Sequence, residues 1–215
     1  MASGLFITLE GIEGSGKTTH AARLADALRS EGRQVTLTHE PGGTSVGGII
    51  RSLFLDPAIK LEVAAELLLV LADRAQHVRE KLKPALDRGE IVISDRYSDS
   101  TVAYQGYGRG FDLKLLDELN RFASDGLVPD LTLVLDCSAE TGLERTRRRA
   151  RKLAQSPDRF EGQDLAFHNR VRDGFLALVR AYPERARLID TALPVETVTV
   201  QIRQAVDELI KHRCL

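Results

Sequence analysis

The sequence predicts an α/β protein with a five-stranded parallel sheet flanked by helices. Short apolar runs rich in β-branched residues alternate with longer stretches of helical period, as in strands joined by crossover helices. Each run ends in an acidic residue, and ligands bind at the carboxyl ends of the strands in open α/β sheets. Five strands are therefore predicted, at residues 5–10, 35–40, 90–95, 131–136 and 187–190.

Three helices are predicted where apolar residues recur at spacings of three and four. The first carries one apolar face over residues 21–28 and stops at Gly32, a favoured residue just past a helix end. The second runs over residues 64–82, and Pro84 is expected to bend or split it. Residues 195–209 include β-branched positions that favour a strand, but their spacing predicts a helix.

Composition narrows the class of protein. The 215 residues contain no Pro-, Gly- or Ser-rich linker, so a single domain over residues 1–215 is expected. Thirty Lys and Arg against 31 Asp and Glu give a net charge of −1, which argues against nucleic acid or a membrane surface as a partner. Two cysteines, Cys137 and Cys214, and apolar runs too short to span a bilayer favour a cytoplasmic protein.

A glycine-rich segment follows the first strand and matches the phosphate-binding P-loop pattern at every fixed position. Glycines allow backbone N–H groups to point at phosphate oxygens, and the next helix presents its positive N-terminus. Lys17 is expected to reach the β- and γ-phosphates, and the Thr18 hydroxyl is expected to bind Mg²⁺. The predicted ATP-binding residues are Gly11, Ile12, Glu13, Gly14, Ser15, Gly16, Lys17 and Thr18.

Other interpretations of this segment are a chance match, a turn used only for packing, or a dinucleotide site. The strand-to-helix context disfavours the first two, and the glycine spacing disfavours the third. A P-loop also occurs in switches and motors, but the base-reading segment Asn-Lys-x-Asp of guanine-nucleotide switches is missing from the sequence. Large motor ATPases need further domains that this length does not supply.

Asp95, Arg96 and Tyr97 follow the third predicted strand, at the same edge of the sheet as the P-loop. The Asp95 carboxylate could orient Mg²⁺ through water, and the Arg96 guanidinium could stabilise charge on a transferring phosphoryl group. Both groups suit a kinase. The alternative is an ordinary salt bridge at a strand end.

These segments together resemble bacterial thymidylate kinase, a P-loop nucleoside monophosphate kinase family, over nearly the whole chain. Their order and separations carry the resemblance, because each motif except the first is short. The matching stretches are residues 11–18, 39–44, 95–97, 103–106 and 158–161.

The resemblance implies ATP-dependent phosphorylation of dTMP to dTDP for dTTP synthesis, with Mg²⁺ as cofactor and a homodimeric assembly. Another nucleotide or deoxynucleoside kinase, or a noncatalytic ATP-binding module, is the alternative. The acceptor pocket that the resemblance implies contains Glu40, Arg51, Val70, Arg74, Arg96, Ser100, Tyr104 and Gln105. Of these, three arginines would surround the acceptor phosphate, Ser100 and Gln105 would lie near thymine, and Tyr104 would crowd a ribose 2′-hydroxyl.

Some of these residues could instead have ordinary structural roles. Arg51 and Arg74 could be solvated helix residues, and Tyr104 could be half-buried packing. Val70 stands where the family commonly has a phenylalanine over the thymine ring, so an aliphatic contact is expected in place of stacking. Residues 137–139 replace a turn that more often contains proline in the family.

A dense basic cluster lies at residues 145–152. It could be a nucleic-acid patch or a solvated helix end, but it has no aromatic residues to stack on bases. In the resembling family this stretch belongs to a mobile lid, here about residues 147–160, which supplies an arginine when the P-loop has none. The candidate catalytic residues are therefore Lys17, Asp95, Arg96 and one of the lid arginines Arg149, Arg151 and Arg159.

Overall fold

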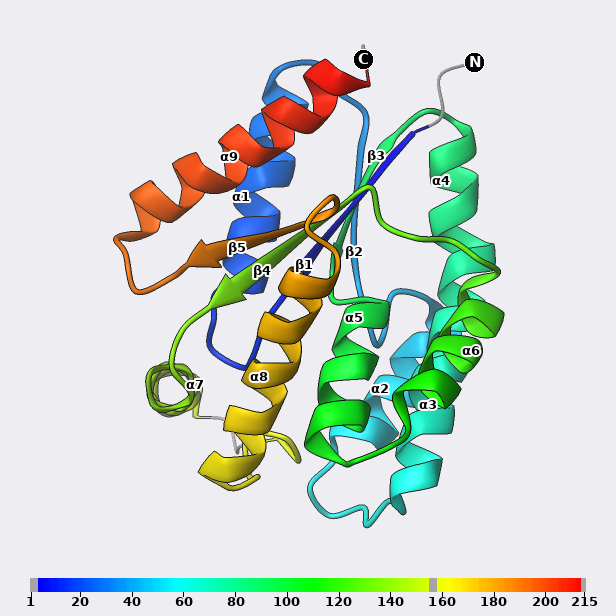
Figure 1. Ribbon diagram of the computed structural model, residues 1–215, viewed down its shortest axis with the longest axis vertical. Coiled ribbons are helices and arrows are strands. Elements are labelled where there is room, and N and C mark those ends of the chain that lie inside the picture. The colour runs from blue at the N-terminus through cyan, green and yellow to red at the C-terminus, as the bar shows by residue number, and fades with distance from the viewer. Residues whose placement is uncertain (1–3, 155–157, 214–215) are drawn as a thin grey trace.

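The computed structural model describes residues 4–154 and 158–213. It contains a five-stranded parallel sheet flanked by helices, which confirms the predicted α/β class (Figure 1). All five predicted strands are present, and three of them differ from the prediction by one residue at one end. The strands are β1 Leu5–Glu10, β2 Val35–His39, β3 Ile91–Asp95, β4 Leu131–Asp136 and β5 Ala186–Asp190.

The helices fill the connections between the strands and cover both faces of the sheet (Figure 1). Two of them continue as π-helical segments, η1 Val78–Leu82 and η2 Val102–Gly108. The α-helices are α1 Lys17–Ser30, α2 Ser45–Leu55, α3 Val63–His77, α4 Lys83–Asp87, α5 Ser98–Thr101, α6 Leu113–Ser124, α7 Ala139–Leu153, α8 Leu165–Ala181 and α9 Val195–His212. Within the described ranges, none of them is long and apolar enough to cross a membrane.

The strand order β2-β3-β1-β4-β5 determines which segments lie next to one another at the carboxyl edge of the sheet. Strand β1 lies in the middle of the sheet, between β3 and β4. Leu9 of β1 pairs with Asp95 of β3, so the segments that follow these two strands leave the same edge side by side. Connections out of adjacent parallel strands form a crevice at that edge.

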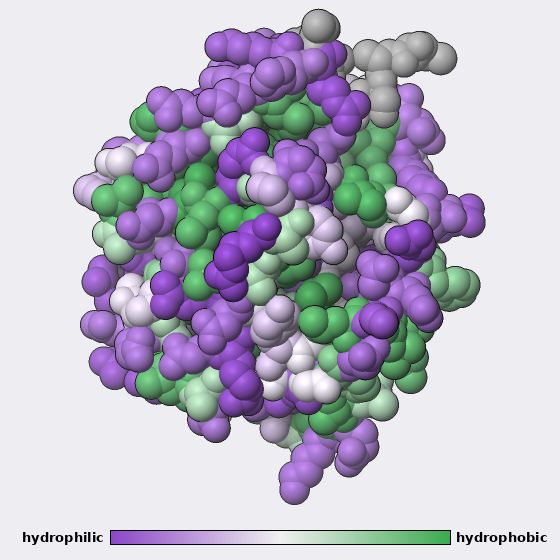
Figure 2. All heavy atoms as spheres, viewed as in Figure 1, coloured by the Kyte–Doolittle hydropathy of each residue, from purple (hydrophilic) through white to green (hydrophobic). Residues whose placement is uncertain are grey.

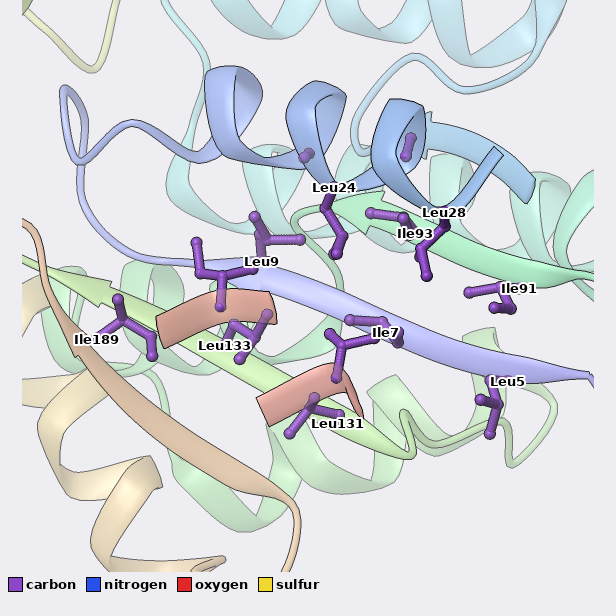
Figure 3. Packing of buried hydrophobic residues seen from close by; sticks show 14 of the residues in the cluster. Leu5, Ile7, Leu9, Leu24, Leu28, Ile91, Ile93, Leu131, Leu133 and Ile189 are labelled. Atoms are coloured by element: carbon purple, nitrogen blue, oxygen red, sulfur yellow. The ribbon is translucent and has the colours of Figure 1, made fainter. Parts of the chain in front are cut away.

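One face of the sheet packs against α1 and α9. Leu5, Ile7 and Leu9 alternate with residues that point the other way, as the two-residue period of a strand requires. Figure 3 shows Leu24 and Leu28 of α1 pointing into this layer. These buried side chains fix the orientation of α1, whose N-terminus closes the P-loop.

The opposite face packs against η1 and α4 and, farther along, against α8. Phe6 and Val92 contact the helical side chains Val78, Leu82 and Leu86. The predicted helix over residues 64–82 continues to Asp87 as α3, η1 and α4, with the π-helical turn directly before Pro84. A π turn suits this position, because proline has no N–H to donate to the preceding turn.

Candidate active site

The P-loop has the backbone geometry of a phosphate cradle. Gly11, Gly14 and Gly16 have φ values of 137°, 72° and 95°, a region that other residues rarely adopt. A Cβ on Gly11 would overlap with the carbonyl oxygen of Leu135, and one on Gly14 with that of Gly142. No side chain caps the start of α1, so its first N–H groups are available to an anion.

Lys17 lies inside this cradle and is 7% exposed. Its Nζ donates to the carbonyl oxygens of Gly11 (3.0 Å) and Ile12 (2.7 Å) and to Ser15 Oγ (3.3 Å). Burial, helped by the nearby charge of Arg96, lowers the pKa of Lys17 to about 8. The ammonium is thus held by weak neutral acceptors that phosphate oxygens can replace.

Thr18 and Asp95 meet across the edge of the sheet, where the Thr18 hydroxyl donates to Asp95 Oδ2 at 2.5 Å. Among the described residues, no group of three or more His, Cys, Asp or Glu side chains could hold a metal by itself. Mg²⁺ is usually bound through one or two carboxylates together with substrate phosphates and water. The hydroxyl and carboxylate oxygens beside the P-loop fit this kind of ion.

Arg96 points from the end of β3 toward the P-loop, with a left-handed backbone at φ 75°. Its Nη1 donates to Gly11 O (3.0 Å) and Ser100 Oγ (3.1 Å), and its Nη2 to Glu13 Oε1 (3.1 Å) and the Tyr104 hydroxyl (3.0 Å). Burial acts to lower the pKa of Arg96, but the neighbouring acidic groups outweigh it and raise the pKa. The guanidinium is therefore a permanent charge in a fixed position.

Glu13 belongs to the P-loop, and its side chain contacts residues of η2 and α8. The Tyr104 hydroxyl donates to Glu13 Oε1 at 2.5 Å, and His168 Nδ1 lies 3.3 Å from Oε2. Burial alone would raise the pKa of Glu13, but His168, Arg96 and Lys17 outweigh it and hold the pKa at about 2. Tyr104 is 6% exposed, so it is more deeply buried than half-buried packing would be.

Glu10, the last residue of β1, lies directly behind Arg96. It is fully buried and accepts from the Tyr97 N–H (2.8 Å) and from Ser100 Oγ (2.5 Å). Burial, together with the nearby charge of Asp99, raises the pKa of Glu10 to about 8. The protonated form of Glu10 is therefore favoured at pH 7, and in that form it leaves the charge of Arg96 available to a phosphate.

Arg74 is 1% exposed, which excludes a solvated helix position. Its Nε and Nη2 both lie 3.0 Å from Glu40 Oε2, and Nη1 donates to Thr101 and Asn120. His77 Nδ1 lies 2.9 Å from the other oxygen of Glu40. Arg74 thus uses four of its five N–H groups within the protein and keeps one.

Arg51 is only half-buried, and its Nη1 donates to the carbonyl oxygen of Pro41 at 2.7 Å. Four of the five N–H groups of Arg51 take no part in this bond, whereas Arg74 and Arg96 each have one such group left. Gln105 is 2% exposed, and its Nε2 donates to Glu66 Oε1 at 2.9 Å. Val70 is half-buried on the neighbouring helix α3.

The groups surround a single cavity of about 550 Å³, large enough for a nucleotide or more. Donor-side and acceptor-side residues line it together. The predicted site residues in its wall are Glu13, Gly14, Lys17, Thr18, Glu40, Arg51, Val70, Arg74, Asp95, Arg96, Ser100, Tyr104, Gln105 and Arg149. The other P-loop positions, Gly11, Ile12, Ser15 and Gly16, form the loop backbone beneath Lys17.

The three candidate lid arginines occupy different environments. Arg149 of α7 lines the cavity and donates to Glu161 Oε1 at 2.9 Å. Arg151 is exposed near the end of the same helix. Arg159 instead donates to Glu66 Oε2 (2.8 Å) and to the carbonyl oxygen of Phe54 (2.9 Å). Residues 155–157 of the predicted lid segment lie outside the described residues.

Four buried polar residues of the site region were missed by the sequence analysis. Glu66, Asp73 and His77 lie on α3, and His168 lies on α8, all at most 1% exposed. Burial and the nearby Glu40 raise the pKa of Asp73 to about 6. The only sequence signal for these residues is a polar side chain at an apolar position of the helical period, which does not reveal a partner.

Comparisons with known proteins agree with this geometry. A family model described as Thymidylate kinase matches residues 9–202. The thymidylate kinase of Deinococcus radiodurans is 50% identical over 208 residues, which cover 97% of this chain and 98% of that protein. The thymidylate kinase of Oleidesulfovibrio alaskensis is 51% identical over 208 residues, covering 95% of this chain and 98% of its own length.

A solved structure shows the same fold. The crystal structure of thymidylate kinase from Ehrlichia chaffeensis superposes with a TM-score of 0.76 and 36% identity, covering 95% of this chain and 99% of that one. Fold, family model and identity over nearly the full length thus agree. The chain belongs to the thymidylate kinase family of phosphotransferases.

Proposed function

We propose that the protein transfers the γ-phosphoryl group of ATP to dTMP, producing dTDP for dTTP synthesis. The observation that carries this proposal is the shared cavity, in which Lys17 of the P-loop and Arg96 after β3 face the same space. A donor phosphate bound to the loop and an acceptor phosphate bound at Arg96 would be adjacent, which in-line transfer requires.

On the donor side, the P-loop backbone from Gly11 to Thr18 holds the phosphates of ATP, and Lys17 exchanges its carbonyl partners for phosphate oxygens. Thr18 and Asp95 are the residues that would hold Mg²⁺, and the ion would neutralise charge on the phosphates. Arg149 is the lid arginine that the cavity favours for contact with ATP, because its side chain lines the wall.

On the acceptor side, Arg51 and Arg96 bind the dTMP phosphate, since guanidinium groups match phosphate geometry. Arg74 contributes its remaining N–H and keeps Glu40 in place. Tyr104, fixed by Arg96 and Glu13, stands where a ribose 2′-hydroxyl would lie and so disfavours ribonucleotides. Val70, Ser100 and Gln105 surround the base.

A coupled assay of ADP release across an acceptor panel tests this function. The panel contains dTMP, dUMP, dCMP, dAMP, dGMP, UMP and free thymidine, each with ATP and Mg²⁺. We expect dTMP to give the highest kcat/KM. A higher value for another monophosphate would reassign the acceptor. If no acceptor accelerates ADP release while ATP binds, the protein is a noncatalytic ATP-binding module.

We also propose a homodimer that buries an apolar strip on α2, α3 and α6. Helix α3 packs between the other two, and Figure 2 shows hydrophobic residues gathered over this part of the molecule. Phe122 is 86% exposed, and several exposed apolar side chains gathered on neighbouring helices mark an interaction surface. The strip comprises Val46, Ile49, Leu53, Leu68, Leu115 and Phe122.

Light scattering coupled to size exclusion tests the assembly. Phe122→Asp should shift the protein from dimer to monomer, because a charge would be buried in the interface. Val200→Asp is the matched control, since Val200 is 54% exposed on α9, on the other side of the sheet. A dimer that survives Phe122→Asp would place the interface elsewhere.

We further propose a domain organisation and a cellular location. Residues 1–215 act as one kinase domain, and residues about 147–160 act as the lid. The protein works in the cytoplasm, in line with a free and buried Cys137. Fractionation of the source cell, followed by detection of the protein, tests this location.

A further inference from the structure

Glu66 lies behind the wall of the cavity and is 1% exposed. It sits in the first turn of α3 and accepts four hydrogen bonds from three side chains. Gln105 Nε2 and Arg109 Nε donate to Oε1 at 2.9 and 3.2 Å, and Arg109 Nη2 and Arg159 Nη1 donate to Oε2 at 3.0 and 2.8 Å. Each oxygen therefore accepts two bonds, which is its full capacity.

The first consequence concerns Gln105. Because the Gln105 NH₂ group donates to a carboxylate that has no proton to give, the amide must keep this orientation. Gln105 lines the cavity, so the orientation of its amide decides which polar atom the bound base meets. A charged acceptor at Glu66 thus fixes part of the cavity wall.

The second consequence concerns Arg159, which lies between α7 and α8 in the chain. Its backbone N–H donates to Leu55 O at 3.1 Å, its Nε donates to Phe54 O, and its guanidinium lies 5.2 and 4.9 Å from the ring centres of Phe54 and Phe160. Both rings line the cavity. Within the described residues, Glu66 is the acidic group paired with Arg159.

We propose that Glu66 is a positioning residue that holds Gln105 in the cavity wall and Arg159 at the base of the lid. One buried carboxylate then supports the acceptor pocket and the lid together, and Arg159 acts through Glu66 and the two phenylalanines instead of contacting ATP. This inference rests on the proposed function only in taking dTMP as the ligand.

Isothermal calorimetry of dTMP binding, without ATP, tests the proposal. We compare the wild-type protein with Glu66→Gln, Arg159→Gln and the double variant. Each single substitution should weaken dTMP binding by about tenfold or more. Glu66→Gln leaves two guanidinium groups without their shared carboxylate, and Arg159→Gln removes one of the two arginines that balance the buried Glu66. The double variant should lose less than the product of the two effects, as residues of one network do.

The matched control is Arg172→Gln, which breaks a two-bond ion pair between α8 and Asp136 outside this cluster. It should leave dTMP affinity unchanged. Amide hydrogen exchange provides a second readout, in which Glu66→Gln accelerates exchange in segments 102–111 and 158–163 and Arg172→Gln accelerates neither.

Three results would overturn the inference. One is unchanged dTMP affinity in Arg159→Gln together with a raised KM for ATP, which is the signature of a direct ATP contact. Another is a double variant whose loss of dTMP affinity equals the product of the two single losses. The third is unchanged exchange in both segments, a readout that holds even if dTMP is not the acceptor. If Glu66→Gln fails to fold, Arg159→Gln decides, because Glu66 then keeps Arg109 as its partner.

Discussion

Glu10 gives a quantitative prediction, because its burial couples protonation to stability. Its pKa is raised from 4.5 to about 8 in the folded protein, so between these values the folded state binds more protons than the unfolded state. The unfolding free energy must then fall as pH rises across this interval. Ionisation of Glu10 destabilises the fold, opposite to the usual effect of a salt-bridged carboxylate.

The magnitude follows from linkage. One proton of difference changes the unfolding free energy by about 1.4 kcal/mol per pH unit, so the whole interval amounts to about 5 kcal/mol. Between pH 5.5 and 7.5 the wild-type protein should lose about 2–3 kcal/mol through this residue. Glu10→Gln removes the titratable group, but the amide can still accept from the Tyr97 N–H and donate to Ser100.

Urea unfolding at several pH values, followed by circular dichroism, measures the effect. From pH 5.5 to 7.5 the unfolding free energy of the wild-type protein should fall relative to that of Glu10→Gln. At the upper end of this range the variant should be the more stable protein. Asp73, whose pKa is raised to about 6, titrates in both proteins and cancels in the difference. Parallel curves across this range would refute the argument, since they would require an ionised Glu10 throughout.

Three further predictions concern catalysis and packing. Arg96→Ala should lower kcat by about 10³-fold or more while ATP binding, measured by calorimetry, largely survives; unchanged turnover would remove Arg96 from the mechanism. The acceptor dUMP should be poor but measurable at saturating concentration, because one methyl group contributes about 1–3 kcal/mol; no detectable turnover would contradict this. Gly142→Ala places a Cβ against the carbonyl oxygen of Glu13. It should lower the unfolding free energy by roughly 1–3 kcal/mol, which lowers Tm by several degrees, and it should raise the KM for ATP. Gly48→Ala is the control, since a Cβ there meets no atom within 4 Å and should leave Tm unchanged or raise it; equal losses in both variants would exclude the contact as the cause.

The three central strands β1, β3 and β4 could be predicted from the sequence because they are buried on both faces. Such strands are mostly apolar runs, and each of these three ends in an acidic residue at the carboxyl edge of the sheet. Helix α9 was predictable despite its β-branched residues, because Val198, Ile202, Val206 and Ile210 all pack into the layer beside α1. Packing of a periodic apolar face outweighs the small intrinsic preference of each residue.

From the residue pattern alone, the site was predictable only where residues follow strands. The predicted residues on helices that line the cavity, such as Val70 and Arg74, came from the family resemblance. Lys17, Thr18, Asp95 and Arg96 are brought together by sheet topology alone, which the sequence pattern indicates. Glu66 could not be found in this way, because its partners lie 39, 43 and 93 positions away on other elements. A polar residue in a helix gives no sign of such distant contacts.

The predicted lid arginines show the same limit. The sequence groups Arg149, Arg151 and Arg159 by charge and by resemblance, whereas the structure separates them by their surroundings. Arg159 is 12% exposed and enclosed by two rings, but Arg149 is 60% exposed and faces the cavity. Spacing along the chain cannot distinguish these positions, because the difference lies in the groups that surround each side chain.

The carbonyl partners of Lys17 have a calorimetric consequence. With a pKa of about 8, a fraction of the ammonium groups is deprotonated in mildly alkaline solution. If anionic phosphate oxygens replace Gly11 O, Ile12 O and Ser15 Oγ as acceptors, triphosphate binding should restore the full charge of Lys17. ATP association near pH 8 therefore takes up protons, and its apparent enthalpy depends on the ionisation heat of the buffer.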